Sequence, residues 1–278
     1  MRYFLILLFS LILYPFNSNS QVIGNYIGDE SILYAQTKQV GQFFRRFNSE
    51  ENQYGERFSI NDSLYRNPDF RKKYLNMLFD NESSIFKKEF KKEFIDEVAN
   101  KKNPSFLNFH GGNWFAEVKT KFIYYDKEET LILFLKLEEE KIGSKWVITN
   151  VYFQPFHQLF LNHDTIAPSD KKFLHPLSHE LDFMNLIKIF NKNEIIEQYA
   201  ANEYYPDYLT LFIYEFKKSN LKFETVINVK FHFFQIDGWY FELSDFNRKS
   251  YNSGWLISNL LKISEDERNI LMKYIYHE

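Results

Sequence analysis

The chain has 278 residues, of which 45% are hydrophobic and 26% are charged, a composition typical of globular proteins and not of disordered ones. Its formal net charge of −3 provides no broad basic field, which argues against a general nucleic-acid binder. No cysteine is present, so disulfide bonds, thiolate nucleophiles and cysteine-based zinc or iron–sulfur sites are excluded.

The first twenty residues have the pattern of a signal peptide. The apolar run over residues 4–16 is shorter than the roughly 20 residues that a membrane-spanning helix requires. Ser18 and Ser20 then occupy the small-residue positions of a cleavage site before Gln21. We therefore predict a signal peptide over residues 1–20, export to the periplasm or exterior of a Gram-negative bacterium, and no integral membrane segment after cleavage.

The first element after the signal peptide is expected to be an amphipathic helix. Val40, Phe43, Phe44 and Phe47 follow the i, i+3, i+4, i+7 spacing of a helix that packs one face on a larger surface. The segment from about residue 50 to about residue 105 has the pattern of a loop followed by helices, and we interpret it as an insertion.

Within that insertion, the segment FKKEFKKEF at residues 86–94 repeats lysines, glutamates and phenylalanines. We expect the phenylalanines to dock on the body of the protein, and Glu89 and Glu93 to pair with lysines on a solvated face. The alternative is a basic amphipathic helix that binds a membrane surface or an acidic partner.

The segment HGGNW at residues 110–114 suggests a pocket at the start of a strand. Its two glycines allow close approach of the backbone, and a histidine beside a tryptophan is suited to line a pocket. With Glu117 as its carboxylate partner, His110 would be suited to proton transfer. His110 and Glu117 are therefore the candidate catalytic residues, with a plain Gly-Gly turn as the alternative.

The pattern further along the chain is rich in β-structure and falls into two sets of strands. The first set covers residues 115–125, 129–140 and 145–153, and the second covers residues 208–216, 221–236 and 238–246.

Two turns and two tryptophans occupy matching places in these sets. Gly-Ser at residues 143–144 marks a turn in the first set, and Asp-Gly at residues 237–238 is typical of a type I′ hairpin. Trp146 and Trp239 are predicted to be core residues, with stacking on a ligand as the alternative.

The segment HPLSHELDF at residues 175–183 is similar to a metalloprotease helix, but it lacks the second histidine of His-Glu-x-x-His. Pro176 keeps the residue before it out of the helical conformation. Ser178 is better explained as an N-cap with Glu180 in the first turn. We therefore predict that His175 and His179 are not metal ligands.

Three further polar residues precede this segment. His157, His163 and Asp164 would form a metal site only if the chain folded back to bring them near His179. Exposed loop histidines are the simpler interpretation, and we predict no metal site.

Two more helices are expected in the second half of the chain. Residues 183–190 repeat the apolar spacing of residues 40–47, and each of these segments is followed by an asparagine. Residues 264–276 predict a closing helix, with Ser264 as its N-cap and acidic residues in its first turn.

Five segments carry a family resemblance: the helices FFRRFN and LIKIFN, the strand start NWFAEV, and the strands KWVITNVYF and GWYFELSDF. They resemble the nuclear-transport-factor-2-like superfamily, in the tandem form of exported proteins of Bacteroidetes. Together with the repeat, the resemblance implies an α+β fold of two units, residues 21–170 and 171–278, each with a helix on a curved antiparallel sheet. The superfamily uses its conical pocket for catalysis in some members and for binding alone in many, so the fold does not decide the function.

The motif content favours binding over catalysis. The sequence contains no Gly-x-Ser-x-Gly elbow, phosphate-binding loop, dinucleotide fingerprint or EF-hand loop. We expect an exported, non-enzymatic protein that needs no cofactor and binds a small ligand, a glycan or an envelope protein. The alternatives are a lyase, isomerase or hydrolase with a histidine and carboxylate in its pocket, and a structural subunit of an envelope complex.

Overall fold

A computed structural model describes residues 39–160 and 200–277, apart from residues 53, 84–87, 142, 202, 250 and 251. The strands are β1 (Trp114–Tyr124), β2 (Lys127–Glu140), β3 (Gly143–Tyr152), β4 (Leu221–Phe233), β5 (Trp239–Phe246) and β6 (Gly254–Lys262). The helices are α3 (Val40–Asn48), α4 (Pro68–Met77), α5 (Lys88–Val98), α6 (Gln154–Phe160), α8 (Tyr208–Lys217) and α9 (Glu265–Tyr276).

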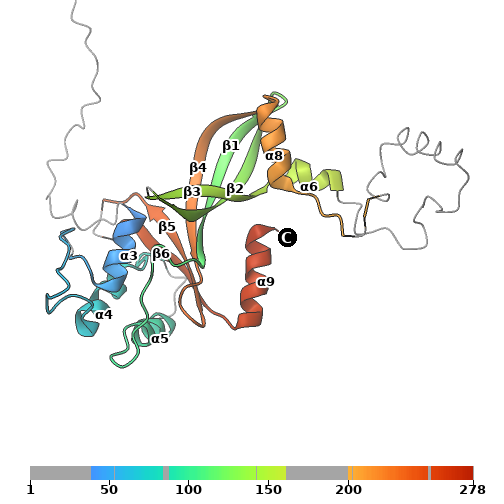
Figure 1. Cartoon of the computed structure of the whole chain (residues 1–278). Helices are drawn as coiled ribbons and strands as arrows, with labels where there is room; N and C mark the ends of the chain where they lie inside the picture. The colour runs from blue at the N-terminus through green and yellow to red at the C-terminus, as the bar shows by residue number, and fades with distance from the viewer. Residues whose placement is uncertain are drawn as a thin grey trace, which may run out of the picture.

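The fold is α+β, and its six strands form one curved, open antiparallel sheet (Figure 1). The strand order is β3-β2-β1-β4-β5-β6. Strands from both predicted units therefore share a single sheet, which is continuous because β1 pairs with β4.

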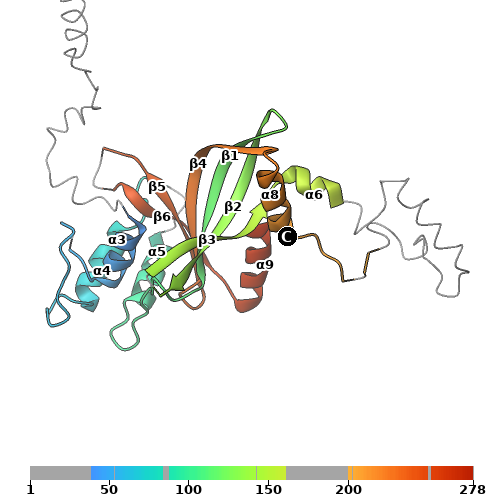
Figure 2. The ribbon, with the colours of Figure 1, turned by 45° about the horizontal axis from the view of Figure 1, so that its top comes forward.

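Helix α3 packs on the sheet through a core of aromatic rings. Phe43 and Phe47 are fully buried. The Phe43 ring lies 6.0 Å from that of Phe233 on β4, and the Phe47 ring stacks on Phe241 of β5 at 5.9 Å. The predicted helix is confirmed, and it covers strands from the other half of the chain. Figure 2 shows α3, α4 and α5 grouped beside β5 and β6, with α9 on the opposite side of the sheet.

Helix α9 covers the second face of the sheet. Tyr276 stacks on Phe115 at a centroid distance of 5.0 Å and packs on Phe134 at 4.6 Å. At the start of the helix, the backbone N–H of Glu267 donates to the Ser264 hydroxyl, and the Glu267 carboxylate accepts from the Ser264 N–H at 2.8 Å. This capping box confirms the predicted closing helix and its N-cap.

The prediction of a strand over residues 208–216 is wrong, because these residues lie in helix α8. The Asp207 side chain caps the helix by accepting from the N–H of Thr210 at 3.0 Å. Phe212 then packs edge-on against Phe122 of β1 at 5.9 Å. A short apolar run without strict alternation fits a buried strand and a helix equally well, so its periodicity does not distinguish them.

The predicted type I′ turn at Asp237 and Gly238 is also wrong. That turn type needs positive φ at both central residues, and only Gly238 has it, at 74°. The connection between β4 and β5 runs over residues 234–238, so the strands are not joined by a two-residue turn. A turn with positive φ at both positions joins β1 to β2 instead, at Tyr125 (45°) and Asp126 (63°).

The two matching tryptophans have different environments. Trp239 is 1% exposed, packs on Phe90 at 5.0 Å and donates from Nε1 to Glu97 at 2.7 Å, which confirms it as a core residue. Trp146 is 39% exposed and contacts Trp114 at 5.3 Å, so the prediction that it is buried is wrong. The difference arises because β3 is an edge strand, whereas Trp239 lies beneath α5.

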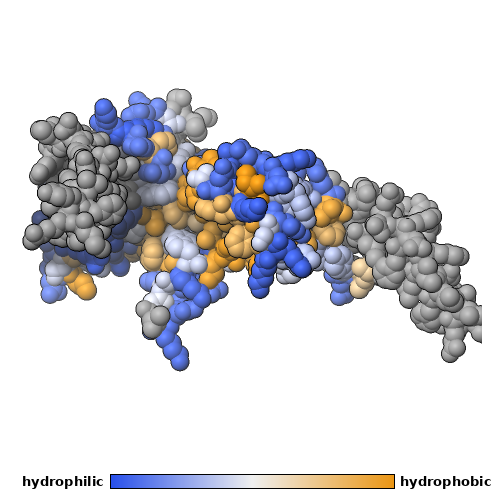
Figure 3. Space-filling model, turned by 90° about the horizontal axis from the view of Figure 1, so that it is seen from above, coloured by the Kyte–Doolittle hydropathy of each residue, from blue (hydrophilic) through white to orange (hydrophobic). Residues whose placement is uncertain are grey.

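Part of β4 and α8 exposes apolar side chains. Phe223, Val226 and Ile227 of β4 and Phe216 of α8 are exposed. Strand β5 pairs with β4 only from Lys230 onward, so the first part of β4 has a strand neighbour on one side. Figure 3 shows hydrophobic surface along the middle of the described part, with hydrophilic surface around it.

None of the described helices is long and apolar enough to cross a membrane. Several predictions concern residues outside the described ranges: the signal peptide over residues 1–20, the helix over residues 183–190, and the loop residues His163, Asp164, His175, Ser178 and His179.

Candidate functional site

The structure gives the two catalytic candidates different partners. His110 lies in the loop before β1 and is 47% exposed, with Nδ1 at 3.2 Å from both Glu139 Oε1 and Ser144 Oγ. Glu117 lies within β1, and its carboxylate contacts His232 of β4. The expected His110–Glu117 pair is therefore not formed, because the loop directs His110 towards the β2–β3 hairpin.

Glu117 belongs to a buried polar chain that links three strands. Its Oε2 atom lies 2.9 Å from Nε2 of His232, whose Nδ1 lies 2.8 Å from the hydroxyl of Tyr240. His232 is 2% exposed and Glu117 is 20% exposed. Both ring nitrogens of His232 are thus engaged within the protein, and these contacts join β1, β4 and β5.

The ionisation of these hydrogen-bonded side chains depends on their surroundings. Burial alone would raise the pKa of Glu117, but the hydrogen bond from His232 and its charge lower that pKa overall. Burial raises the pKa of Tyr240, so its phenol stays protonated. Glu117 is therefore expected to be ionised in the folded protein.

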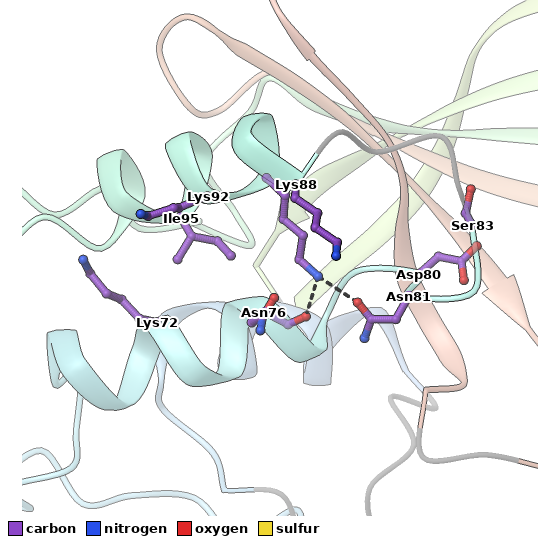
Figure 4. A pocket seen from close by; sticks show the side chains of 9 residues that line it. Lys72, Asn76, Asp80, Asn81, Ser83, Lys88, Lys92 and Ile95 are labelled. Carbon is purple, nitrogen blue, oxygen red and sulfur yellow. Dashed lines mark hydrogen bonds between the residues drawn. The ribbon is translucent and has the colours of Figure 1, made fainter.

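A pocket of about 500 Å³ opens between α4 and α5 (Figure 4). Helix α5 places Lys88, Lys91, Lys92 and Ile95 along it, at i, i+3, i+4 and i+7, and α4 contributes Lys72 from the other side. Because residues at this spacing share one helical face, the lysines of α5 gather at the pocket.

The opposite face of α5 holds the helix against the sheet. Phe94 is fully buried and packs edge-on against Trp239 at 5.2 Å, so the expected docking of the phenylalanines is confirmed for the described residues. The expected pairing within the helix is wrong for Glu93, which pairs with Lys262 of β6 at 2.7 Å. This ion pair joins α5 to the sheet. Glu93 is therefore not the ion-pair partner of a lysine at the pocket.

Lys91 is the most constrained lysine of the pocket. Its Nζ donates to the backbone oxygen of Asn76 at 3.0 Å and to Oδ1 of Asn81 at 2.7 Å. The same nitrogen lies 4.7 Å from the centroid of the Phe79 ring. Burial lowers the pKa of Lys91, so an anion beside it would replace some of the solvation that the ammonium has lost.

The carboxylates at and beside the pocket already have cationic partners. Asp80 accepts from Arg248 at 2.7 Å. Asp96 accepts from Lys72 at 2.5 Å, so this lysine of the pocket is already paired. Among the described residues, Lys88 and Lys92 form no ion pair. The lining therefore carries an excess of positive charge, and the arrangement is suited to hold an anion.

The described residues contain no group of three histidine, aspartate or glutamate side chains that could hold a metal ion. Comparisons of the chain with protein-family models, curated proteins and solved structures found no match.

Proposed function

We propose that the protein is an exported, non-enzymatic binding protein that takes a phosphate-like anion between α4 and α5. The site is called the lysine pocket and consists of Lys72, Lys88, Lys91 and Lys92. The observation that carries the proposal is the gathering of three lysines of α5 beside one acidic side chain, Asp80, which Arg248 already neutralises. An ammonium group is a compact point charge, which suits the spread negative charge of a phosphate or sulfate group.

The lining of the lysine pocket favours binding over turnover. A general base must be free to accept a proton, and Asp80 is engaged by Arg248 at 2.7 Å. Lys91 is held in place by two oxygen acceptors. These groups position an anion without removing a proton from it.

The family relationship and the export of the protein belong to the same proposal. A curved antiparallel sheet with α3 packed across one face supports a relationship to nuclear-transport-factor-2-like proteins. The apolar run and the small residues within residues 1–20 support export.

Removing two lysines should weaken the binding of pyrophosphate. We expect isothermal titration at low ionic strength to show binding to the wild type, and a dissociation constant at least tenfold higher for the double variant Lys88→Gln/Lys92→Gln. The reason is that both side chains carry charge at the pocket without forming an ion pair among the described residues.

The matched control is Lys73→Gln/Lys102→Gln, which changes the net charge equally at two exposed positions outside the pocket. Its dissociation constant should stay within about twofold of the wild-type value, since exposed charges that are distant from a ligand are screened by salt. Equal weakening in both double variants, or no binding of pyrophosphate by the wild type, would contradict the proposal.

A second candidate function is assembly into an envelope complex, which the exposed apolar residues of β4 and α8 favour. We expect native mass spectrometry of protein exported with its own signal to show stable oligomers or bound partners. The mass of the chain should correspond to a first residue at Gln21. The variant Phe223→Ser/Val226→Ser should dissociate them. A wild-type monomer without a partner counts against assembly, and an uncleaved chain counts against export.

A further inference from the structure

A second recess, of about 660 Å³, lies along α3, between the loop that follows the helix and residues 106–109. We propose that this recess binds a carboxylate carried on a flat ring. It is called the arginine groove and is defined by Arg45, Arg57, Arg66, Phe106 and Phe109. The site is separate from the lysine pocket, and the two proposals do not depend on each other.

The guanidinium groups of the groove have N–H donors that form no hydrogen bond with the carboxylates of Glu50 and Glu51. Arg66 donates from Nε and Nη2 to Oε1 of Glu50, at 2.8 and 2.6 Å, and Arg45 donates from Nε to Glu51 at 2.6 Å. Each guanidinium has five N–H donors, so these bonds leave most of them unused. Arg57 is exposed and forms no ion pair within the described ranges.

The charge balance in the groove favours an anion. Its lining contains three arginines and one acidic residue, Glu50. Glu50 already accepts from Arg66 and, at 3.4 Å, from Asn48. Arg45 shares the Glu51 carboxylate with Arg46. The positive excess of the groove therefore lies mainly at Arg57, and a ligand carboxylate can take the donors that Glu50 and Glu51 do not use.

Aromatic rings lie beside these donors. The guanidinium carbon of Arg66 is 4.5 Å from the centroid of the half-buried Phe106 ring. Phe109, also half-buried, packs edge-on against Phe44 at 5.2 Å. The guanidinium carbon of Arg71 also lies over the Phe106 ring, at 4.4 Å, so a flat ring would pack against the edge of Phe106 and against Phe109 while its carboxylate reaches the arginines. Neither acetate nor an uncharged ring would use both features.

The walls of the groove are fixed before any ligand arrives. The buried amide of Asn48 donates to the carbonyl of Leu107 at 2.8 Å and accepts from the N–H of Leu107 at 2.9 Å. Gln235, from the loop after β4, donates to the carbonyl of Asn108 at 2.7 Å. Because the segment that carries Phe106 and Phe109 is already ordered, a ligand loses little affinity to ordering it.

The groove and the lysine pocket should prefer different anions, because one presents arginines and the other presents lysines. The planar guanidinium matches the two oxygens of a carboxylate, whereas an ammonium provides a single charged point. The ring and the carboxylate should therefore both be required here, which is not expected of the lysine pocket.

The probe is 2-naphthoate, measured by isothermal titration with the mature chain. Acetate lacks the ring, and 2-naphthalenemethanol lacks the charge, so we expect each to bind at least tenfold more weakly than 2-naphthoate. Arg57→Gln should raise the dissociation constant of 2-naphthoate at least fivefold. Lys92→Gln, which removes the same charge from the lysine pocket, should leave it within twofold.

Three results would overturn the proposal. They are equal effects of Arg57→Gln and Lys92→Gln, binding of 2-naphthalenemethanol as tight as that of 2-naphthoate, and unchanged affinity in Phe106→Leu. Phe106 also lies 4.4 Å from the guanidinium carbon of Arg71, so the melting temperature of Phe106→Leu is measured first. If that variant is unfolded, Arg66→Gln, at a half-exposed position, replaces it and should weaken 2-naphthoate at least fivefold.

Discussion

Replacing Arg71 with methionine should lower the free energy of unfolding by about 3–5 kcal/mol, because three hydrogen bonds to a charged group are lost and each contributes about 1.5–3 kcal/mol. Arg71 lies on α4 and is fully buried. Its guanidinium donates to the carbonyls of Phe47 at 2.8 Å, Val98 at 3.0 Å and Ser105. Methionine would fill a similar volume but would leave these three carbonyls without that donor.

The positions of these carbonyls explain why a cation is buried there. Phe47 is in the last turn of α3, and Val98 is the last residue of α5. Carbonyl groups at a helix C-terminus have no partner within the helix and form the negative end of its dipole. Arg71 therefore joins two helix ends and the segment that leads to β1, and burial lowers the pKa of its guanidinium without removing these contacts.

Urea unfolding monitored by circular dichroism measures the decrease in the free energy of unfolding. Arg71→Lys keeps the charge but cannot reach three carbonyls with one ammonium, so it should fall between the wild type and Arg71→Met. Lys73→Met, at an exposed position of the same helix, should stay within about 0.5 kcal/mol of the wild type. A loss below about 1 kcal/mol for Arg71→Met would show that water or rearranged backbone groups replace the guanidinium.

Local patterns in the sequence were sufficient for the elements whose contacts are local. The apolar spacing of residues 40–47 identified α3, and Ser264 with its acidic first turn identified α9. Strand β6 is not indicated by the sequence, because Gly254–Lys262 has no strict alternation of apolar and polar residues. Trp146 was misjudged for a different reason, since nothing local to it indicates that β3 lies at an edge of the sheet.

The two polar sites depend on contacts between distant residues. The lysine face of α5 is visible in the sequence as the spacing of Lys88, Lys91 and Lys92, but the position of α4 opposite that face is not. Glu117 and His232 are separated by 115 residues, and they meet because Phe115 is the pairing partner of His232 in the register of β1 with β4. Register is fixed by the packing of the whole sheet, so His232 was not recognised as the partner of Glu117.

A second large effect on the free energy of unfolding is expected when the contact between Glu117 and His232 is removed. Glu117→Gln should lower the free energy of unfolding at pH 7 by about 2 kcal/mol, within the range for a hydrogen bond to a charged group. The neutral amide loses the charge that His232 stabilises. It also presents an amide nitrogen as well as an oxygen to a buried ring whose other nitrogen is engaged by Tyr240.

The effect should depend on pH in a defined direction. The pKa of Glu117 in the folded protein is lowered from its ordinary value of 4.5, so the ionised carboxylate stabilises the fold above that pH. This contribution is lost as the pH falls through the lowered pKa, because the carboxylate is then protonated in both states. The difference between the wild type and Glu117→Gln should therefore be largest near neutral pH and shrink steadily below pH 4.5.

A double-mutant cycle separates the pair from other effects of each substitution. Urea unfolding of Glu117→Gln, His232→Gln and the double variant at pH 7 should give a coupling energy of about 1.5–2 kcal/mol, most of the value of the charged hydrogen bond. Glu138→Gln, at an exposed position of β2, should change stability by less than about 0.5 kcal/mol at every pH. A coupling energy near zero would mean that each side chain is satisfied separately, and a pH-independent effect of Glu117→Gln would mean that its carboxylate is not held by its charge. The combination of coupling and acid sensitivity is expected only if the ionised Glu117 carboxylate joins β1 to His232 of β4.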